Sequence, residues 1–316
     1  MYSIRKKKIN KKEYNYIETS FRLPDGKVKK LSKFIREPEK PYGDDVSQYF
    51  LKKEIESYQN YALSRYKIDT IFNEDVLKKA EEIRVKYRHL KRYFKDKAMK
   101  DLIDRFTINF TYESNAIEGN SLTLKEVTML LLNDLSPKDK KLREIFETRN
   151  SRIVTEMLFR GELKITLNDI LKIHSLLMKD TGINLGFKSF PNYIAMSDLK
   201  TVPPEKAESE IIKLVNWYHR EKERCHPVLL ASEFHGRFEM IHPFEDGNGR
   251  CGRILINAIL VDNDYPPLII RKSVRMAYYR ALDAFDKGHK MKLERFILEK
   301  FVATFEKFFE VYVKYV

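Results

Sequence analysis

The sequence has few cysteines and no long apolar run. Its two cysteines, Cys225 and Cys251, exclude a disulfide scaffold and are typical of a protein of the reducing cytoplasm. The most apolar segment, residues 254–261, contains Asn257 and is far shorter than the roughly 18 residues that a membrane-spanning helix needs. Residues 5–8 are basic, but no apolar run follows them, so the central part of a secretory signal is missing. We therefore expect a cytoplasmic protein that does not span a membrane.

Positive charge is abundant but unevenly distributed. The 316 residues carry 60 Lys and Arg against 46 Asp and Glu, a formal net charge of +14. Residues 1–40 alone hold 13 basic and 5 acidic residues, so more than half of the excess lies in the first eighth of the chain. Such an excess is the usual footprint of nucleic-acid binding, but no helix-turn-helix, zinc-finger or RNA-recognition motif accompanies it. We interpret it as a solvated basic surface and do not expect a nucleic-acid partner.

Apolar periodicity predicts an all-α fold with two small β segments. Residues 14–23 and 27–35, joined by the turn Pro24-Asp25-Gly26, predict an N-terminal β-hairpin. The segment from Gly182 to Pro204 interrupts the helical pattern and is the best candidate for a short β flap. Residues 73–97 repeat apolar side chains every three or four positions and predict a long amphipathic helix. Further helices are expected at about residues 101–117, 123–133, 138–160, 167–179, 205–223, 228–240, 250–262, 273–286 and 290–314.

The most informative segment runs from Ile241 to Arg253, between two predicted helices. The second helix is apolar on almost all sides, so it should be buried, and its Gly-Asn-Gly start offers free N–H groups to an anion. Arg250 and Arg253 lie three residues apart, so both guanidinium groups are expected to face one cluster of phosphate oxygens. Asp246 is a hard oxygen ligand for a bridging Mg²⁺, and His242 accepts a proton near neutral pH. Together these features indicate attack by a hydroxyl on a magnesium-bound nucleotide phosphate.

The same segment carries a family resemblance. The run His242-Pro243-Phe244-Glu245-Asp246-Gly247-Asn248-Gly249-Arg250-Cys251-Gly252-Arg253 resembles the complete signature of the Fic (filamentation induced by cAMP), or Fido, family, H-P-F-x-[D/E]-G-N-G-R-x-x-R. The resemblance extends over about residues 100–310. It implies an all-helical core with a short β flap, and we expect an N-terminal region at residues 1–99 and a catalytic domain at residues 100–316.

The activity implied by this resemblance is protein AMPylation, in which AMP moves from ATP to a Ser, Thr or Tyr hydroxyl of a target protein and pyrophosphate leaves. His242 would deprotonate the hydroxyl, Asp246 would bind Mg²⁺, and Phe244 would anchor the loop. The flap, within Lys188 to Lys200, would align the target by strand addition. The implied nucleotide-binding residues are Gly247, Asn248, Gly249, Arg250, Gly252, Arg253 and Tyr278. The implied flap residues are Tyr193, Ile194 and Ala195.

A second motif resembles the family's inhibitory helix, [S/T]-x-x-x-E-[G/N]. It is the run Ser114-Asn115-Ala116-Ile117-Glu118-Gly119-Asn120, in a helix expected around residues 105–119. Ser114 and Glu118 lie one turn apart on the same helix face. By the resemblance, Glu118 would pair with Arg253 and keep the resting enzyme weakly active.

Several alternatives stay open at this point. The same site could remove AMP, because in some relatives the residue equivalent to Glu118 also positions a water for that reaction. It could also use another nucleotide, because Asp286 stands where relatives frequently have Asn near the implied adenine contact Tyr278. A catalytically silent basic module that binds nucleic acid or a partner is a different class of function. Self-modification and a homodimer are also left open, and the target protein is not named by the sequence.

Overall fold

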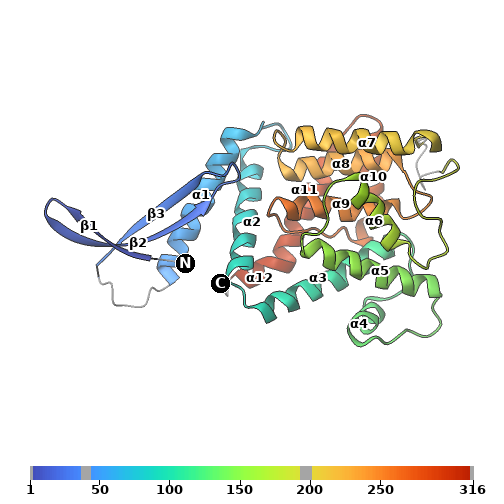
Figure 1. Cartoon of the computed structure of the whole chain (residues 1–316), viewed down its shortest axis with the longest axis horizontal. Coiled ribbons are helices and arrows are strands. Elements are labelled where there is room, and N and C mark those ends of the chain that lie inside the picture. The colour runs from blue at the N-terminus through green and yellow to red at the C-terminus, as the bar shows by residue number, and fades with distance from the viewer. Residues whose placement is uncertain (1–2, 37–43, 193–200, 314–316) are drawn as a thin grey trace. The chain divides into compact units, whose positions relative to one another are not determined.

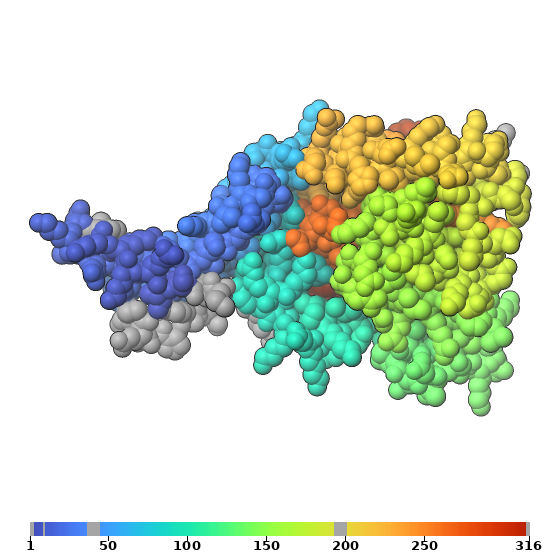
Figure 2. Space-filling view, in the orientation of Figure 1, coloured from blue at the N-terminus to red at the C-terminus, as the bar shows by residue number. Residues whose placement is uncertain are grey.

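Helix α9 (Asn248–Asp262) forms the centre of the helical part of the chain. It is buried almost without interruption from Asn248 to Leu260, as its nearly continuous apolar sequence predicts. It packs against α8 (Pro227–Ile241), α5 (Leu142–Phe159) and α6 (Leu167–Leu177). Figure 1 shows α9 surrounded by other helices, and Figure 2 exposes little of the orange segment that contains it.

This computed structural model describes residues 3–36, 44–192 and 201–313. The chain divides into two compact units, Met1–Lys86 and Tyr87–Val316. The boundary between them falls inside helix α2 (Glu74–Tyr93). The division into functional regions after residue 99 stays a prediction.

The first unit is a three-stranded antiparallel sheet with helix α1 (Asp44–Arg65) and the start of α2. The strands β1 (Ser3–Ile9), β2 (Lys12–Arg22) and β3 (Val28–Ile35) lie in sequence order. The expected hairpin is confirmed as β2 and β3, which pair through residues 15–22 and 28–35. Its inner face buries Ile17 and Phe21 against Phe50 and Tyr58 of α1.

Strand β1 was not expected from the sequence. Its Arg-Lys-Lys-Lys run lacks the alternation of apolar and polar residues that predicts a strand. Backbone pairing with β2 and two ion pairs hold it, because Glu18 lies 2.6 Å from Lys7 Nζ and 3.4 Å from Arg5 Nε. Lysines are common on edge strands, where they discourage pairing with other chains.

The second unit is helical, which confirms the predicted fold class. Side-chain caps define the start of two of its helices. Thr123 and Glu126 form a capping box before α4, and Thr166 accepts from the N–H of Asp169 at the start of α6. No helix among residues 3–36, 44–192 and 201–313 is long and apolar enough to cross a bilayer. The remaining elements are α3 (Asp96–Ile117), α4 (Leu124–Asn133), α7 (Pro204–Glu221), the 3₁₀ turn Lys272–Val274, α10 (Arg275–Asp286), α11 (Met291–Thr304), the π-helical turn Phe305–Phe309 and α12 (Glu310–Val313).

The expected long helix at residues 73–97 is interrupted. Helix α2 ends at Tyr93 and α3 begins at Asp96. Lys91 and Arg92 lie in the last turn of α2 and Asp96 in the first turn of α3, where each charge suits the helix dipole. The sequence placed this break after residue 97, about four residues late, because the apolar period continues to Phe94.

Two hydrogen bonds of the Asn257 side chain explain why a polar residue lies in the most apolar helix. Asn257 on α9 is fully buried and binds both backbone groups of Leu268. Its Nδ2 donates to Leu268 O at 3.0 Å, and the N–H of Leu268 donates to its Oδ1 at 2.8 Å. The side chain thus attaches the segment after α9 to the helix.

Replacing this amide should lower stability. Asn257→Ala leaves two buried backbone groups of Leu268 without a partner, so we expect the free energy of unfolding to fall by about 2–4 kcal/mol. Asn263→Ala is the matched control, because Asn263 Nδ2 donates only to Ile259 O in a partly buried position. Urea unfolding followed by circular dichroism would measure both. Equal losses for the two variants would contradict the assigned role.

Candidate active site

The motif turns the chain sharply between α8 and α9. His242 ends α8 in the left-handed conformation, with φ 48° and ψ 61°, and Gly247 precedes α9 with φ 82°. The side chain of Asn248 closes the loop between them. The N–H of Phe244 donates to Asn248 Oδ1 at 2.9 Å, and Asn248 Nδ2 donates to Phe244 O at 2.8 Å. The loop therefore fixes His242 beside the free N–H groups at the start of α9.

Phe244 anchors this loop in the core, as expected. Its ring is fully buried and stacks on His174 of α6, with the ring centroids 3.9 Å apart. His174 Nε2 lies 3.1 Å from the backbone oxygen of Asp246, so α6 supports the loop at two points. Burial lowers the pKa of His174 to about 4, which keeps the ring neutral at physiological pH.

The segment before the expected flap is attached to the same loop. The N–H of Lys188 donates to Pro243 O at 2.9 Å, and Asn192 Nδ2 donates to Phe244 O at 2.7 Å. The described chain thus contacts the motif loop at both Lys188 and Asn192. The expected flap residues lie outside the described residues, and their role stays a prediction: Tyr193, Ile194 and Ala195.

A pocket of about 240 Å³ opens at the N-terminus of α9. The positive end of a helix dipole and its free N–H groups make this an anion site. The pocket brings together the expected base, metal ligand, glycine-containing turn and one of the two arginines. Its lining residues are Glu118, Glu239, His242, Glu245, Asp246, Gly247, Asn248, Gly249, Arg253, Tyr278, Tyr279 and Leu282.

Arg253 is bound by both residues of the expected inhibitory motif. Its side chain is 2% exposed, and its Nε and Nη2 donate to Ser114 Oγ and Ser114 O, each at 2.9 Å. Nη2 also lies 2.7 Å from Glu118 Oε1. Burial lowers the pKa of Arg253, but the Glu118 carboxylate outweighs it and the pKa is raised. The expected ion pair is therefore present in the structure.

The Glu118 carboxylate also covers the start of α9. A Cβ atom at Gly249 would collide with Glu118 Oε1 and lie 3.0 Å from Arg253 Nη1. Glycine at this position lets the carboxylate approach the helix N-terminus closely. Glu118 thus places a negative charge where the pocket is suited to a phosphate.

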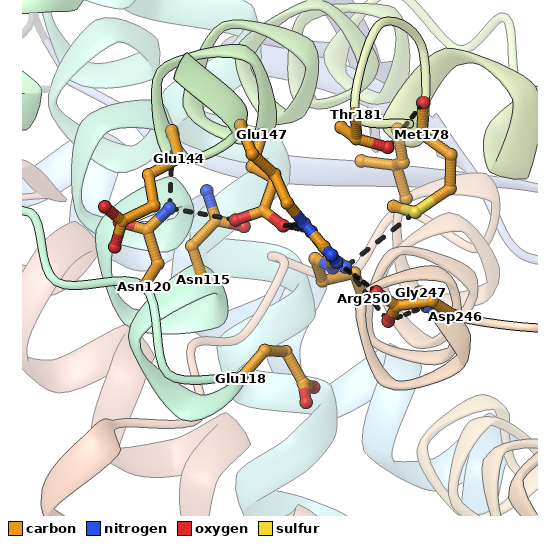
Figure 3. Close-up of polar contacts among 12 residues, drawn as sticks. Asn115, Glu118, Asn120, Glu144, Glu147, Met178, Thr181, Asp246, Gly247 and Arg250 are labelled. Carbon is orange, nitrogen blue, oxygen red and sulfur yellow. Dashed lines mark hydrogen bonds and ion pairs between the residues drawn. The ribbon is translucent and has the colours of Figure 1, made fainter. Parts of the chain in front are cut away.

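Arg250 does not line the pocket, although both arginines were expected to face one cluster of phosphate oxygens. Its side chain is 3% exposed and points toward α5, where its Nη1 lies 3.0 Å from Glu147 Oε1. Its Nη2 contacts Asp246 Oδ1 at 3.2 Å and Met178 Sδ at 3.8 Å. Figure 3 shows these contacts, with the Glu118 carboxylate lying apart from them. A direct contact between Arg250 and a nucleotide stays a prediction.

Asp246 is held by cations in this state. Arg143 Nη2 and Arg250 Nη2 both donate to its carboxylate, as does the N–H of Gly247. Burial raises the pKa of Asp246, but these three donors outweigh it and the pKa is lowered. The carboxylate is therefore ionised, as a metal ligand must be.

The donor set fits Mg²⁺ only in company with a substrate. Among the described residues, no group of three His, Cys, Asp or Glu side chains could hold a metal ion. Mg²⁺ commonly binds one or two carboxylates and completes its octahedron with substrate phosphates and water. Asp246 lines the pocket beside the anion site, so its carboxylate fits this pattern.

His242 lies beside the buried carboxyl group of Glu239. Its Nδ1 is 3.6 Å from Glu239 Oε2, one turn earlier on α8. Burial, assisted by the charge of Lys188, lowers the pKa of His242 to about 4. Burial raises the pKa of Glu239 to about 8. The imidazole is therefore neutral across the physiological range and able to accept a proton.

Two further residues with an implied nucleotide contact, Tyr278 and Gly252, both lie close to His235. Tyr278 Oη is 2.7 Å from His235 Nε2, and the two rings stack with 7° between their planes. Gly252 faces His235 and Glu239, since a Cβ there would lie 2.7 Å from both side chains. Tyr278 lines the pocket whereas Gly252 does not, and their nucleotide contacts stay predictions.

Sequence reasoning missed four residues that support the site: Arg143, Glu147, His174 and Glu239. Glu239 had a local signal, because it lies three residues before His242 on the same helix face. His174 and the two residues of α5 had none, because packing of distant helices brings them to the loop.

The second unit matches a known family. The model of the Fic/DOC family matches residues 164–260, which include the whole motif. These residues are therefore similar to a Fic/DOC domain. A Fic domain-containing signalling protein from Bacteroides thetaiotaomicron is 25% identical with a TM-score of 0.66, covering 72% of this chain and 94% of that one. Fic-1 from Caenorhabditis elegans shares the fold at a TM-score of 0.63 and 21% identity, covering 84% of this chain and 73% of that one.

Curated relatives of the Fic/DOC domain carry an activity in their names. The protein adenylyltransferase Fic of Nematostella vectensis is 30% identical over 204 residues, which are 63% of this chain and 48% of that protein. The protein of the same name from Drosophila virilis is 31% identical over 194 residues, 60% of this chain and 40% of that protein. The chain thus spans about half the length of these relatives, or less.

The lowered pKa of His242 can be measured directly. We expect NMR titration of its imidazole to give a midpoint of about 4, well below the ordinary 6.5. Lys188→Met should raise this midpoint, because the lysine charge disfavours the imidazolium. Lys30→Met, which removes an exposed lysine of the first unit, should leave it unchanged. A midpoint near the ordinary value in the unmodified chain would refute the burial argument.

Proposed function

We propose that this chain transfers AMP from ATP to a Ser, Thr or Tyr hydroxyl of a target protein. The observation that carries the proposal is the single pocket that holds a neutral histidine, an ionised carboxylate, a helix N-terminus and Arg253. The names of the curated relatives support the same reaction class. The proposal concerns this chain, which spans only part of those proteins.

His242 acts as the general base in this reaction. Its Nδ1 faces Glu239, so Nε2 is the nitrogen that takes the proton of the target hydroxyl. The hydroxyl oxygen then bonds to the α-phosphorus of ATP. The bond between that phosphorus and the oxygen bridging to the β-phosphate breaks, and pyrophosphate leaves.

The start of α9 binds the phosphates. The backbone N–H groups of the turn Gly247-Asn248-Gly249 face the α- and β-phosphates, and Arg253 binds the outer ones. Tyr278, which lines the pocket, is assigned to contact the adenine ring of ATP. Asp246 would hold Mg²⁺, which neutralises phosphate charge when it is bound together with ATP.

Glu118 restrains this reaction. Its carboxylate occupies the guanidinium of Arg253 and the space over Gly249, both of which the outer phosphates of ATP need. ATP would therefore bind in a pose that is unsuited to transfer. We call this inhibitory contact of Glu118 with Arg253 the brake. Its free energy is that of a charge-assisted hydrogen bond, about 1.5–3 kcal/mol.

Removing the brake should raise activity. We expect Glu118→Ala to increase AMP transfer about ten- to hundredfold, from the free energy of one charge-assisted hydrogen bond. The matched control is Glu113→Ala, which removes a carboxylate of the same helix that binds Lys272 and Arg271 instead. Incorporation of label from α-labelled ATP measures both. Equal transfer by Glu118→Ala and the unmodified chain would contradict the brake.

The choice of label separates the alternative chemistries. Protein labelled from α-labelled but not from γ-labelled ATP supports AMP transfer. Label retained from γ-labelled ATP would instead indicate phosphotransfer, and preference for another nucleotide would revise the donor. Loss of label from a modified protein would indicate AMP removal by the same site. Absence of any covalent label with the Glu118→Ala variant would favour a silent binding module.

The assigned base has its own test. We expect His242→Ala in the Glu118→Ala background to lower transfer by about 10²–10⁴-fold, as loss of a general base does. Thermal unfolding should be nearly unchanged, because His242 lies at a helix end with few partners. Transfer at the parent rate would remove His242 from the mechanism.

Further features of the proposal rest on the sequence. The target is a protein hydroxyl, with self-modification as one form of the reaction, and a homodimer and a cytoplasmic location remain predictions. A nucleic-acid partner is not expected, since no nucleic-acid-binding motif accompanies the excess charge.

A further inference from the structure

Four charged side chains beside the pocket form a closed ring. Glu147 Oε1 lies 3.1 Å from Arg143 Nε and 3.0 Å from Arg250 Nη1. The same two arginines contact the two oxygens of the Asp246 carboxylate. Each arginine thus bridges both carboxylates, and charges alternate around the ring. Figure 3 shows Glu147, Arg250 and Asp246 converging from α5 and from the start of α9.

The charges of the ring balance only because of Glu147. Two guanidinium groups on one carboxylate would leave an excess positive charge beside Asp246 and would repel a divalent cation. With Glu147 present, the four groups sum to zero. The carboxylate of Glu147 is also a second acceptor for both arginines when Asp246 turns toward another cation.

The two arginines differ in their freedom to move. The side chain of Arg250 is 3% exposed, so it cannot exchange a protein partner for water at low cost. The side chain of Arg143 is 44% exposed and can turn into solvent. Arg143 is therefore the cation of the ring that competes with a metal for Asp246.

We propose that Glu147 is a positioning residue that sets the affinity of Asp246 for a divalent cation, by holding Arg143 and Arg250 partly away from it. The inference rests on the assignment of Asp246 as the metal ligand of the proposed function. Glu147 does not line the pocket. It acts through the two arginines, as residues behind a metal ligand commonly do.

The ring is tied to the segment that carries the brake. Asn120 Nδ2 donates to Glu147 Oε2 at 3.0 Å, and Asn120 lies two residues after Glu118. The same amide donates to Glu144 O at 3.1 Å. The second oxygen of Glu147 is therefore fixed, which leaves Oε1 to hold the arginines.

Binding of Mn²⁺ without turnover tests the inference. Free Mn²⁺ is counted by electron paramagnetic resonance in the Glu118→Ala background, with α,β-methylene ATP present so that no AMP is transferred. We expect Glu147→Gln to weaken Mn²⁺ binding about tenfold, because both arginines then rely on Asp246. Arg143→Gln should tighten it by a similar factor, about tenfold, because the competing cation is gone.

A neighbouring carboxylate provides the matched control. The control is Glu144→Gln. Glu144 lies one turn before Glu147 on α5, and its side chain accepts from the N–H of Ser121 at 2.6 Å. Among the described residues, this side chain has no contact with the ring. The substitution should leave Mn²⁺ affinity unchanged. If Glu147→Gln fails to fold by circular dichroism, the exposed Arg143→Gln still decides the question by the direction of its effect.

Opposite changes in Mn²⁺ affinity for Glu147→Gln and Arg143→Gln would support the inference even if no AMP transfer were ever found. The lack of transfer would refute only the proposed function. Weaker binding in both variants would point to a merely structural ring and overturn it. Mn²⁺ binding that is insensitive to Asp246→Asn would also overturn it, because the cation would then lie elsewhere.

Discussion

The structure of the pocket depends on the need of one buried guanidinium for an anion. Arg253 is 2% exposed at the start of a helix that is itself buried. An unpaired charge in such a place is unstable by several kcal/mol, so the group must always bind an anion. In the structure that anion is Glu118, and in the proposed reaction it is the outer phosphate of ATP. Resting and working states thus exchange one anion for another at the same two donors, the guanidinium and the helix N-terminus.

The two arginines of the motif have separate tasks although they lie on the same helical turn. Arg253 faces α3, where Ser114 and Glu118 bind it reversibly in the proposed mechanism. Arg250 faces α5, where Glu147 and Asp246 enclose it. The burial of α9 between different neighbours turns a sequence spacing of three into two distinct environments. One is suited to exchanging ligands and the other to holding the carboxylate that the proposal assigns to the metal.

Local signals in the sequence predicted the helical fold and the hairpin of β2 and β3, whereas the contact of Glu118 with Arg253 was implied by the family resemblance. They succeeded where the cause is local. Apolar periodicity predicted the buried helix α9, the turn at Gly26 predicted the hairpin, and the spacing of one helical turn placed Ser114 and Glu118 on the same helix face. They failed for β1, because charge hides its strand pattern. They also failed for the direction of Arg250, because Glu147 lies more than 100 residues away. The environment of a buried charge depends on tertiary neighbours, which spacing along one chain does not encode.

In the proposed mechanism, Glu118 and the outer phosphate of ATP compete for Arg253. Calorimetric affinities for ATP and ADP, in the unmodified chain and in Glu118→Ala, test it most directly. ADP lacks the phosphate that would need Arg253. The account predicts that Glu118→Ala tightens ATP binding by about tenfold or more while ADP affinity changes much less, since one charge-assisted hydrogen bond is gained. An equal change for both nucleotides, or none for either, would contradict it.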